Sequence, residues 1–135
     1  MALLARKKTL IAKSEASYGV DSSPSGSANA ILVRELDISP LEVDEVERTL
    51  VRPYLGNYET LLGAQRATMS FSVEMAGSGA AGTANQGLGV FLKACGFSET
   101  VASGTSVTYA PVSAAFSSAT IGVNIDGTNH QLTGS

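Results

Sequence analysis

Few residues of this chain are of types that do chemistry, and the first candidate is a glycine-rich run. Gly77-Ser78-Gly79-Ala80-Ala81-Gly82 matches the pattern G-x-G-x-x-G, which binds a dinucleotide pyrophosphate at a helix N-terminus. The strand expected before it alternates in polarity, whereas a nucleotide-binding strand is apolar on both faces. Too little chain follows the run to complete such a sheet. This context favours a mobile loop and no cofactor.

The chain has one histidine and one cysteine. His130 lies beside an expected hairpin turn, so we interpret it as a surface or strand-edge residue. Cys95 falls on the apolar face of an expected helix, where a small core residue is the simplest interpretation. A nucleophile needs an activating base, and a metal site needs several ligands. The sequence therefore predicts no enzyme, no metal centre and no intrachain disulfide.

Acidic residues are concentrated between Glu35 and Glu47, which include six of the twelve. Calcium prefers carboxylates, but the D-x-D-x-D-G spacing with a terminal Glu is missing. We expect a solvated face or an extended segment whose charges meet a neighbour. A basic segment over 3–13 could pair with these acids in the same or a neighbouring subunit. Its charges are Arg6, Lys7, Lys8 and Lys13.

Charge is distributed very unevenly along the chain. Eighteen of the twenty-one charged residues precede position 75, and the last 61 residues carry only Lys93, Glu99 and Asp126. A soluble domain normally keeps a surface of mixed charge. The charge-poor part therefore suggests a surface that faces other protein molecules rather than bulk water.

The composition is that of a small globular protein. With 135 residues and a net charge of −3, we expect one domain over 1–135 without general attraction for DNA or anionic lipid. The N-terminal apolar stretch is too short for a secretory signal, and the uncharged stretch 75–92 is interrupted by five glycines. We therefore expect a soluble protein made in the cytoplasm, with no membrane partner.

The elements expected from periodicity are mainly strands. Alternation is clearest over 65–76, where Ala67, Met69, Phe71, Val73 and Met75 share one face. Further strands are expected at 9–12, 30–38, 106–110, 118–125 and 131–133, with an exposed loop over 14–29 and a turn at 56–58. A short helix over 85–96 ends at Gly96, and Asp126-Gly127 indicates a hairpin turn. The sum is a mainly β protein, an antiparallel sandwich or half-barrel with one flanking helix.

The segment 39–56 is an arm or loop whose local structure is ambiguous. Ser39-Pro40-Leu41-Glu42 fits a helix capping box, yet the residues that follow also alternate as a strand would. The last hairpin stops at Ser135, where a sandwich would need the strand to continue. Either the chain is shortened or another chain supplies a strand.

The order of several short motifs resembles the tail tube (major tail) proteins of long-tailed bacteriophages or prophages. The motifs are Leu36-Asp37-Ile38-Ser39-Pro40-Leu41, the segment from Glu47 to Gly56, the helix end Leu92-Lys93-Ala94-Cys95-Gly96-Phe97, and Asn124-Ile125-Asp126-Gly127 through Gly134. The likeness covers most of 30–134. Family members usually continue with further strands after the final Leu-Thr-Gly.

The resemblance implies a β-sandwich or half-barrel with a flanking helix, similar to the type VI secretion tube protein. Such subunits close into rings, usually of six, which stack into a hollow tube that conducts DNA without specific binding. It implies a virion location and contacts with tape-measure and terminator proteins. Leu41–Leu55 would be the arm that reaches the next ring. The family has no catalytic residues. Expected inter-subunit contacts are Leu41, Val43, Val46, Leu50, Val51, Tyr54 and Leu55.

Two other functions are compatible with the sequence. The first is another tail component of the same fold, such as a terminator or a baseplate adaptor. The second is a small β-sandwich module that binds sugars or cell-surface ligands. An enzyme is the weakest alternative, because one His and one Cys cannot form a catalytic group.

Overall fold

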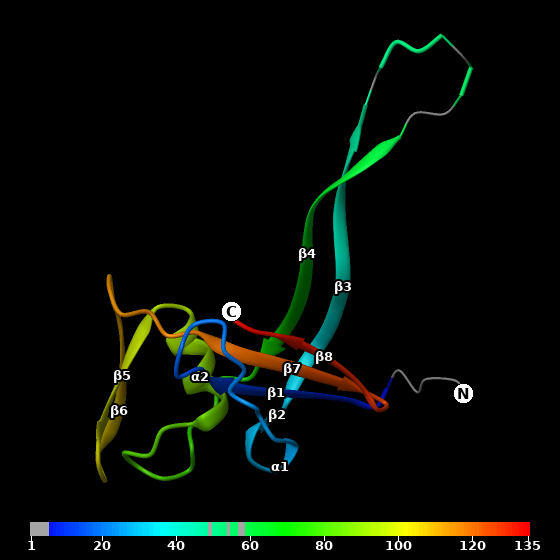
Figure 1. The fold of residues 1–135 in the computed structure, drawn as a ribbon. Helices are drawn as coiled ribbons and strands as arrows, with labels where there is room; N and C mark the ends of the chain where they lie inside the picture. Colours follow the sequence, from blue (N-terminus) through cyan, green and yellow to red (C-terminus); the bar gives the residue numbers. More distant parts are fainter. Residues whose placement is uncertain (1–5, 49, 54, 57–58) are drawn as a thin grey trace. The chain divides into compact units, whose positions relative to one another are not determined.

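The structure is a computed structural model that describes residues 6–48, 50–53, 55–56 and 59–135. The predicted mainly β fold is confirmed, with 49% strand, 10% helix and antiparallel sheets. The chain forms two compact units, Met1–Arg34 with Ser72–Ser135 (the main unit) and Glu35–Phe71 (the hairpin unit). The expectation of a single domain over 1–135 stays a prediction. Figure 1 shows the elements: β1 (Lys8–Ser14), α1 (Gly26–Asn29), β2 (Ala30–Ile31), β3 (Val33–Glu47), β4 (Thr60–Val73), α2 (Gln86–Ala94), β5 (Phe97–Ala102), β6 (Ser106–Pro111), β7 (Ala119–Ile125) and β8 (Thr128–Leu132).

The core of the main unit lies on one face of a four-stranded antiparallel sheet. The strand order is β2-β1-β7-β8, and β1 pairs with β7 along its whole length. Leu10 lies opposite Val123 and Ala12 opposite Ile121, and all four side chains are buried. Burying a side chain such as Leu10 or Val123 stabilises the fold by about 1.5–3 kcal/mol. The apolar alternation of β1 therefore fixes the face that it buries, whereas β7 is buried on both faces from Ala119 to Val123.

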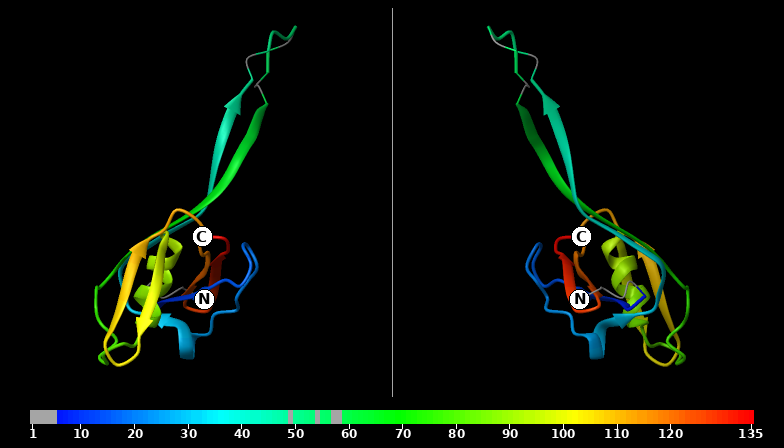
Figure 2. Two further views of the ribbon diagram at one scale, coloured as in Figure 1. Left: turned by 90° about the vertical axis from the view of Figure 1, so that its left-hand side faces the viewer. Right: turned by 90° about the vertical axis from the view of Figure 1, so that its right-hand side faces the viewer.

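Helix α2 packs against the sheet and against β5, as Figure 2 also shows. Its N-terminus is capped by Asn85, whose side-chain oxygen accepts hydrogen bonds from the N–H groups of Gly87 and Leu88. Gly96 takes a φ of +84° immediately after the C-cap Cys95. Because that conformation favours glycine, the chain can leave the helix there and enter β5.

The turn between β7 and β8 confirms the predicted Asp126-Gly127 hairpin. Both residues have positive φ, +46° and +94°, as a two-residue type I′ turn requires. Ile125 lies opposite Thr128, so β8 starts three residues before the predicted strand at 131–133. It forms one edge of the four-stranded sheet.

Several expectations about the elements are corrected by the structure. Of the helix and the strand left open after Ser39, the structure has the strand, because Ser39 and Pro40 lie inside β3, which runs to Glu47. Proline is tolerated there because each strand of a two-stranded sheet has an outer edge. The segment 14–29 is not loop throughout, since it ends in α1 and begins with Ser14 of β1. β5 was not expected, and the predicted turn at 56–58 lies mostly outside the described residues.

Candidate assembly surfaces

Strands β3 and β4 pair as a long two-stranded hairpin with one charged face. Arg66 Nε lies 3.0 Å from Glu42 Oε2, and Arg66 Nη2 lies 3.6 Å from Asp44 Oδ1. Thr68 Oγ1 donates a hydrogen bond of 3.4 Å to the same Glu42 oxygen. The even-numbered side chains of both strands therefore share this face.

The opposite face of the hairpin is apolar in its middle part, around Leu41 and Val43, and carries the carboxylates of Glu45 and Glu47 toward the far end of β3. Because side chains alternate along a strand, Leu41 and Val43 of β3 share that face with Ala67 and Met69 of β4. Leu41 and Ala67 are exposed, whereas Val43 and Met69 are half-buried. No described residue of the hairpin unit is fully buried, so this unit has no core of its own. A two-stranded hairpin alone is marginally stable in water, which means that this face needs a partner surface.

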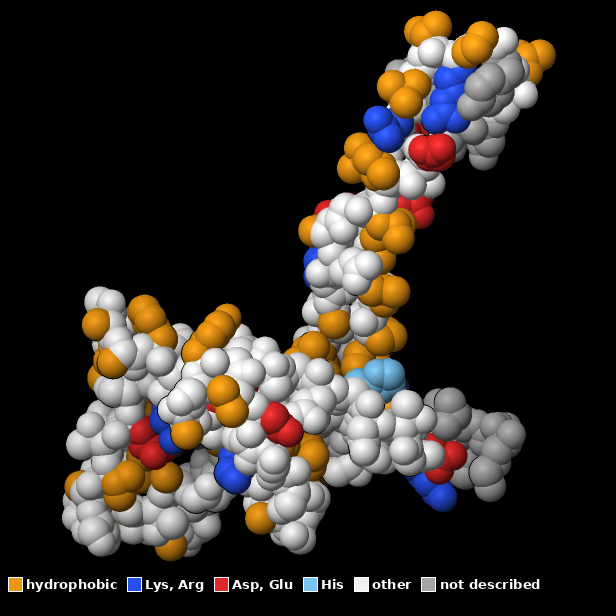
Figure 3. All heavy atoms as spheres, viewed as in Figure 1, with side chains coloured by type: hydrophobic (Ala, Val, Ile, Leu, Met, Phe, Trp, Pro, Cys, Tyr) orange, Lys and Arg blue, Asp and Glu red, His pale blue; other side chains and the backbone are white. Residues whose placement is uncertain are grey.

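The far end of the hairpin, the hairpin tip (residues 48–59, of which 49, 54, 57 and 58 are not described), also presents apolar side chains, which Figure 3 shows beside basic ones. Val51 and Leu55 are fully exposed, and Leu50 is partly exposed. Arg52 Nη2 lies 3.6 Å from Glu59 Oε1 and ties the two sides of the tip together. Of the seven predicted contact residues, six are described and lie on β3 or the tip, whereas Tyr54 lies outside the described residues.

Each of the few charges in the charge-poor part has an ion-pair partner, and for two of them the partner lies within the same part. Lys93 Nζ lies 3.7 Å from Glu99 Oε1, and Tyr109 donates a 2.7 Å hydrogen bond to Glu99 Oε2. The third charge, Asp126, lies 4.0 Å from Lys7 Nζ. Burial, the hydrogen bond to Glu99 and the charge of Glu99 raise the pKa of Tyr109 to about 12. The surface formed by this part is therefore nearly free of unpaired charge.

Glu15 is a polar junction that no sequence pattern predicted. Its carboxylate accepts hydrogen bonds from Ser118 Oγ (2.6 Å), Thr120 Oγ1 (2.9 Å) and the N–H groups of Gly134 (2.8 Å) and Gly19 (2.9 Å). The hydrogen bond from Ser118 contributes most to lowering the pKa of Glu15 to about 2. One carboxylate thus joins the end of β1, the loop after it, β7 and the chain end.

The glycine-rich run lines a pocket of about 440 Å³ beside Asn85, Leu88 and Tyr109. Its loop is internally hydrogen-bonded, since Ser78 Oγ donates to Thr83 O at 2.7 Å. The N–H groups of Gly87 and Leu88 are already engaged by Asn85. A bound phosphate would need such amides to be free, so this arrangement differs from that of a nucleotide-binding turn.

The remaining candidate residues do not come together. His130 lies on the edge strand β8 opposite Val123, which confirms the strand-edge interpretation. Cys95 is exposed, so its interpretation as a core residue was wrong. The helix ends at Ala94, and the backbone of Cys95 leaves the helical conformation (ψ 12°). Within the described ranges, no three His, Cys, Asp or Glu side chains are grouped as metal ligands.

Neither the hydropathy of the helices nor a comparison with known proteins assigns a function. No helix in the described part of the chain has the length and hydropathy needed to cross a membrane. Comparisons with protein-family models, with curated proteins and with solved structures find no significant match.

Proposed function

We propose that the protein is a structural, non-enzymatic subunit that self-associates, of the tail tube type found in long-tailed bacteriophages and prophages. Copies would close into rings, and stacked rings would form a hollow channel that conducts DNA. The β3–β4 hairpin carries this proposal, because it exposes apolar side chains on its middle part and at its tip and has no buried residue among those described. Such a segment gains stability only by packing against other protein surface.

The main unit offers a second reason to expect self-association. The edge strand β8, Thr-Asn-His-Gln-Leu, contains no charged residue and no proline. Proteins commonly protect an exposed strand edge with charged residues or proline, because unpaired backbone groups attract other strands. Because β8 itself carries no charged side chain, pairing of another strand along it would not bury a charge of this strand.

The finer parts of the proposal come from the sequence resemblance. It implies a ring of six subunits, a place in the virion tail, and contacts with tape-measure and terminator proteins. The acidic net charge of −3 suits a channel through which DNA passes without being held. No cofactor and no membrane partner are part of this proposal.

The test is a shortened hairpin measured beside the intact chain. Residues 48–59 are replaced by Asn-Gly, which joins Glu47 to Thr60 by a two-residue turn. Sedimentation velocity and negative-stain microscopy should show rings or tubes for the intact protein. The shortened variant should lose stacked assemblies while keeping its circular dichroism spectrum.

A milder variant separates the chemistry of the tip from its length. V51S/L55S should also reduce stacking, as the shortened hairpin does. L32S, at an exposed leucine of the main unit, should not reduce it. Tubes that form undiminished from the shortened hairpin would overturn the role of the tip. An intact protein that stays monomeric at high concentration would overturn the proposed function and favour a binding module.

A further inference from the structure

The two units of the chain differ in the sign of their charge. The hairpin unit contains seven acidic and three basic residues, a formal charge of −4, whereas the main unit contains five acidic and six basic residues, a charge of +1. Two hairpin units brought side by side would therefore repel each other. The charge distribution favours contact between the hairpin unit of one copy and the main unit of another.

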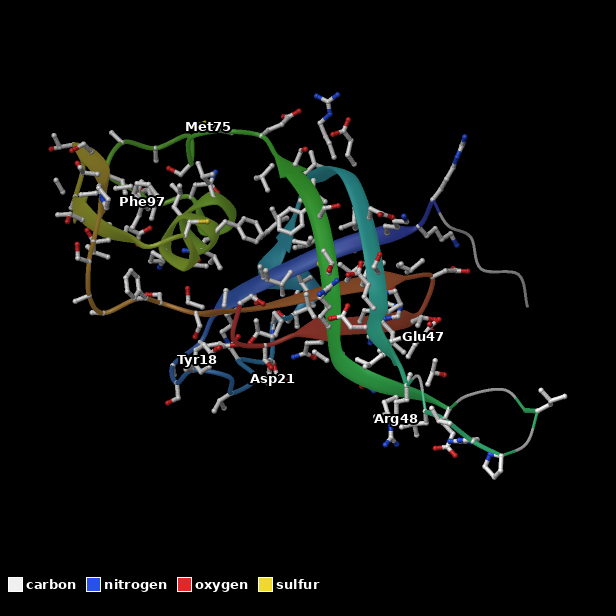
Figure 4. All side chains as sticks on the ribbon, turned by 90° about the horizontal axis from the view of Figure 1, so that it is seen from above. Tyr18, Asp21, Glu47, Arg48, Met75 and Phe97 are labelled. Atoms are coloured by element: carbon white, nitrogen blue, oxygen red, sulfur yellow. The ribbon has the colours of Figure 1, made fainter. Side chains whose placement is uncertain are left out.

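Within the hairpin, the acids available for such a contact lie next to the tip. Arg66 engages Glu42 and Asp44. Glu45 and Glu47 are exposed, and neither has an ion pair among the residues that the structure describes. Figure 4 shows Glu47 and Arg48 where β3 ends. An approaching molecule would therefore meet these two carboxylates, followed by the exposed Arg48, beside the apolar side chains of the tip.

The complementary charges of the main unit are concentrated at the start of β1. Arg6, Lys7 and Lys8 are consecutive and exposed, and we call them the basic margin. Lys7 is only weakly engaged, since its Nζ lies 4.0 Å from Asp126 Oδ1 and its side chain is 69% exposed. The other three bases of the main unit lie outside the margin: Lys13 Nζ donates to Ser22 O at 2.8 Å, Lys93 pairs with Glu99, and Arg34 lies on β3.

We propose that the basic margin of one copy receives Glu45 and Glu47 of a second copy. The inference rests on the proposed function and names the partner surface of the hairpin. The contact joins two different surfaces, so each copy has one of each to offer, and the association can propagate into a ring or a stack. The charges set the position of the hairpin on its partner, while the apolar tip next to them is buried.

Charge reversal on each side tests the contact. E45K/E47K and R6E/K8E should each weaken self-association by about tenfold or more, because attraction across the contact becomes repulsion. An equimolar mixture of the two variants should associate again, since each supplies the surface that the other now needs. The combined variant R6E/K8E/E45K/E47K should associate alone, and it keeps the net charge of the natural chain.

Matched controls are reversals of exposed charges of the main unit outside the margin, E74K and R34E. Both should associate like the natural protein, and association of that protein should weaken with added salt. Equal association of all variants would overturn the proposed contact and leave the tail-tube proposal standing. A natural chain that never associates would overturn both.

Discussion

Lys93 Nζ lies 3.7 Å from Glu99 Oε1 and so joins the last turn of α2 to β5. Tyr109 of β6 completes the group by donating its hydroxyl hydrogen to the other carboxylate oxygen at 2.7 Å. Two of the three charges in the charge-poor part are therefore used to hold its helix against its small sheet. A surface without free charge is thus compatible with a well-defined fold, because polar groups are satisfied internally.

Tyr109 should titrate unusually late. Its pKa is raised from the usual 10 to about 12, so the neutral phenol is favoured in the folded state. The stabilisation is fully present below pH 10 and is lost as pH rises through about 12. Absorbance titration should show a late-ionising tyrosine that disappears in Y109F. The same variant should lower the free energy of unfolding by about 1 kcal/mol, the usual net value of one hydrogen bond. An unchanged titration in Y109F would show that this assignment is wrong.

Gly89 allows α2 to approach this group closely. A Cβ at this position would lie 2.7 Å from Glu99 Oε2 and 2.8 Å from Tyr109 Oη, so G89A must displace one of them. Alanine gains about 1 kcal/mol in helix propensity, but the overlap costs about 1–3 kcal/mol. We expect a net loss of about 1 kcal/mol by urea denaturation. G77A, whose Cβ meets nothing within 4 Å, should change stability by less than about 0.5 kcal/mol.

The glycine-rich run contains a matched pair of sites. Gly79 and Gly82 have φ values of +82° and +65°, so alanine is strained at both by about 1–2 kcal/mol. A Cβ at Gly79 would meet nothing within 4 Å, whereas one at Gly82 would overlap the backbone of Ala102 and Gly104. G82A should therefore destabilise the protein by at least about 1 kcal/mol more than G79A. Equal unfolding midpoints for the two variants would mean that the loop does not pack on the β5–β6 turn.

Sequence reasoning succeeded where the determinant was local. Gly96, the alternation before Val73 and the pair Asp126-Gly127 each specify a helix end, a strand or a turn through nearby residues. The segment after Ser39 could not be resolved in the same way, because its pattern suits a helix as well as a strand. In the structure this segment is a strand, because it pairs with β4, and Arg66 of β4 contacts Glu42.

Features that depend on distant residues were missed. The partners of Glu15 on β7 and at the chain end lie more than 100 positions away, so nothing near Glu15 in sequence indicates its role. β5 was missed because Glu99 interrupts the apolar alternation of this strand. Glu99 is there because it contacts Lys93 and Tyr109, which lie on other elements. Cys95 was misplaced because helical periodicity was extended one residue past the end of the helix.

Glu15 should make the stability of the main unit sensitive to acid. Its pKa falls from the usual 4.5 to about 2 on folding, because four hydrogen-bond donors favour the carboxylate. Because folding lowers the pKa of Glu15, the stabilisation that this carboxylate provides is present above pH 4.5 and is lost as pH falls through about 2. The natural protein should therefore show a falling Tm over that interval. E15Q, whose amide offers fewer acceptor positions to the same donors, should have a lower Tm at pH 7 and a flatter acid profile. E74Q, at an exposed glutamate, controls for the general loss of negative charge, and a profile for E15Q that runs parallel to it would remove Glu15 as the cause.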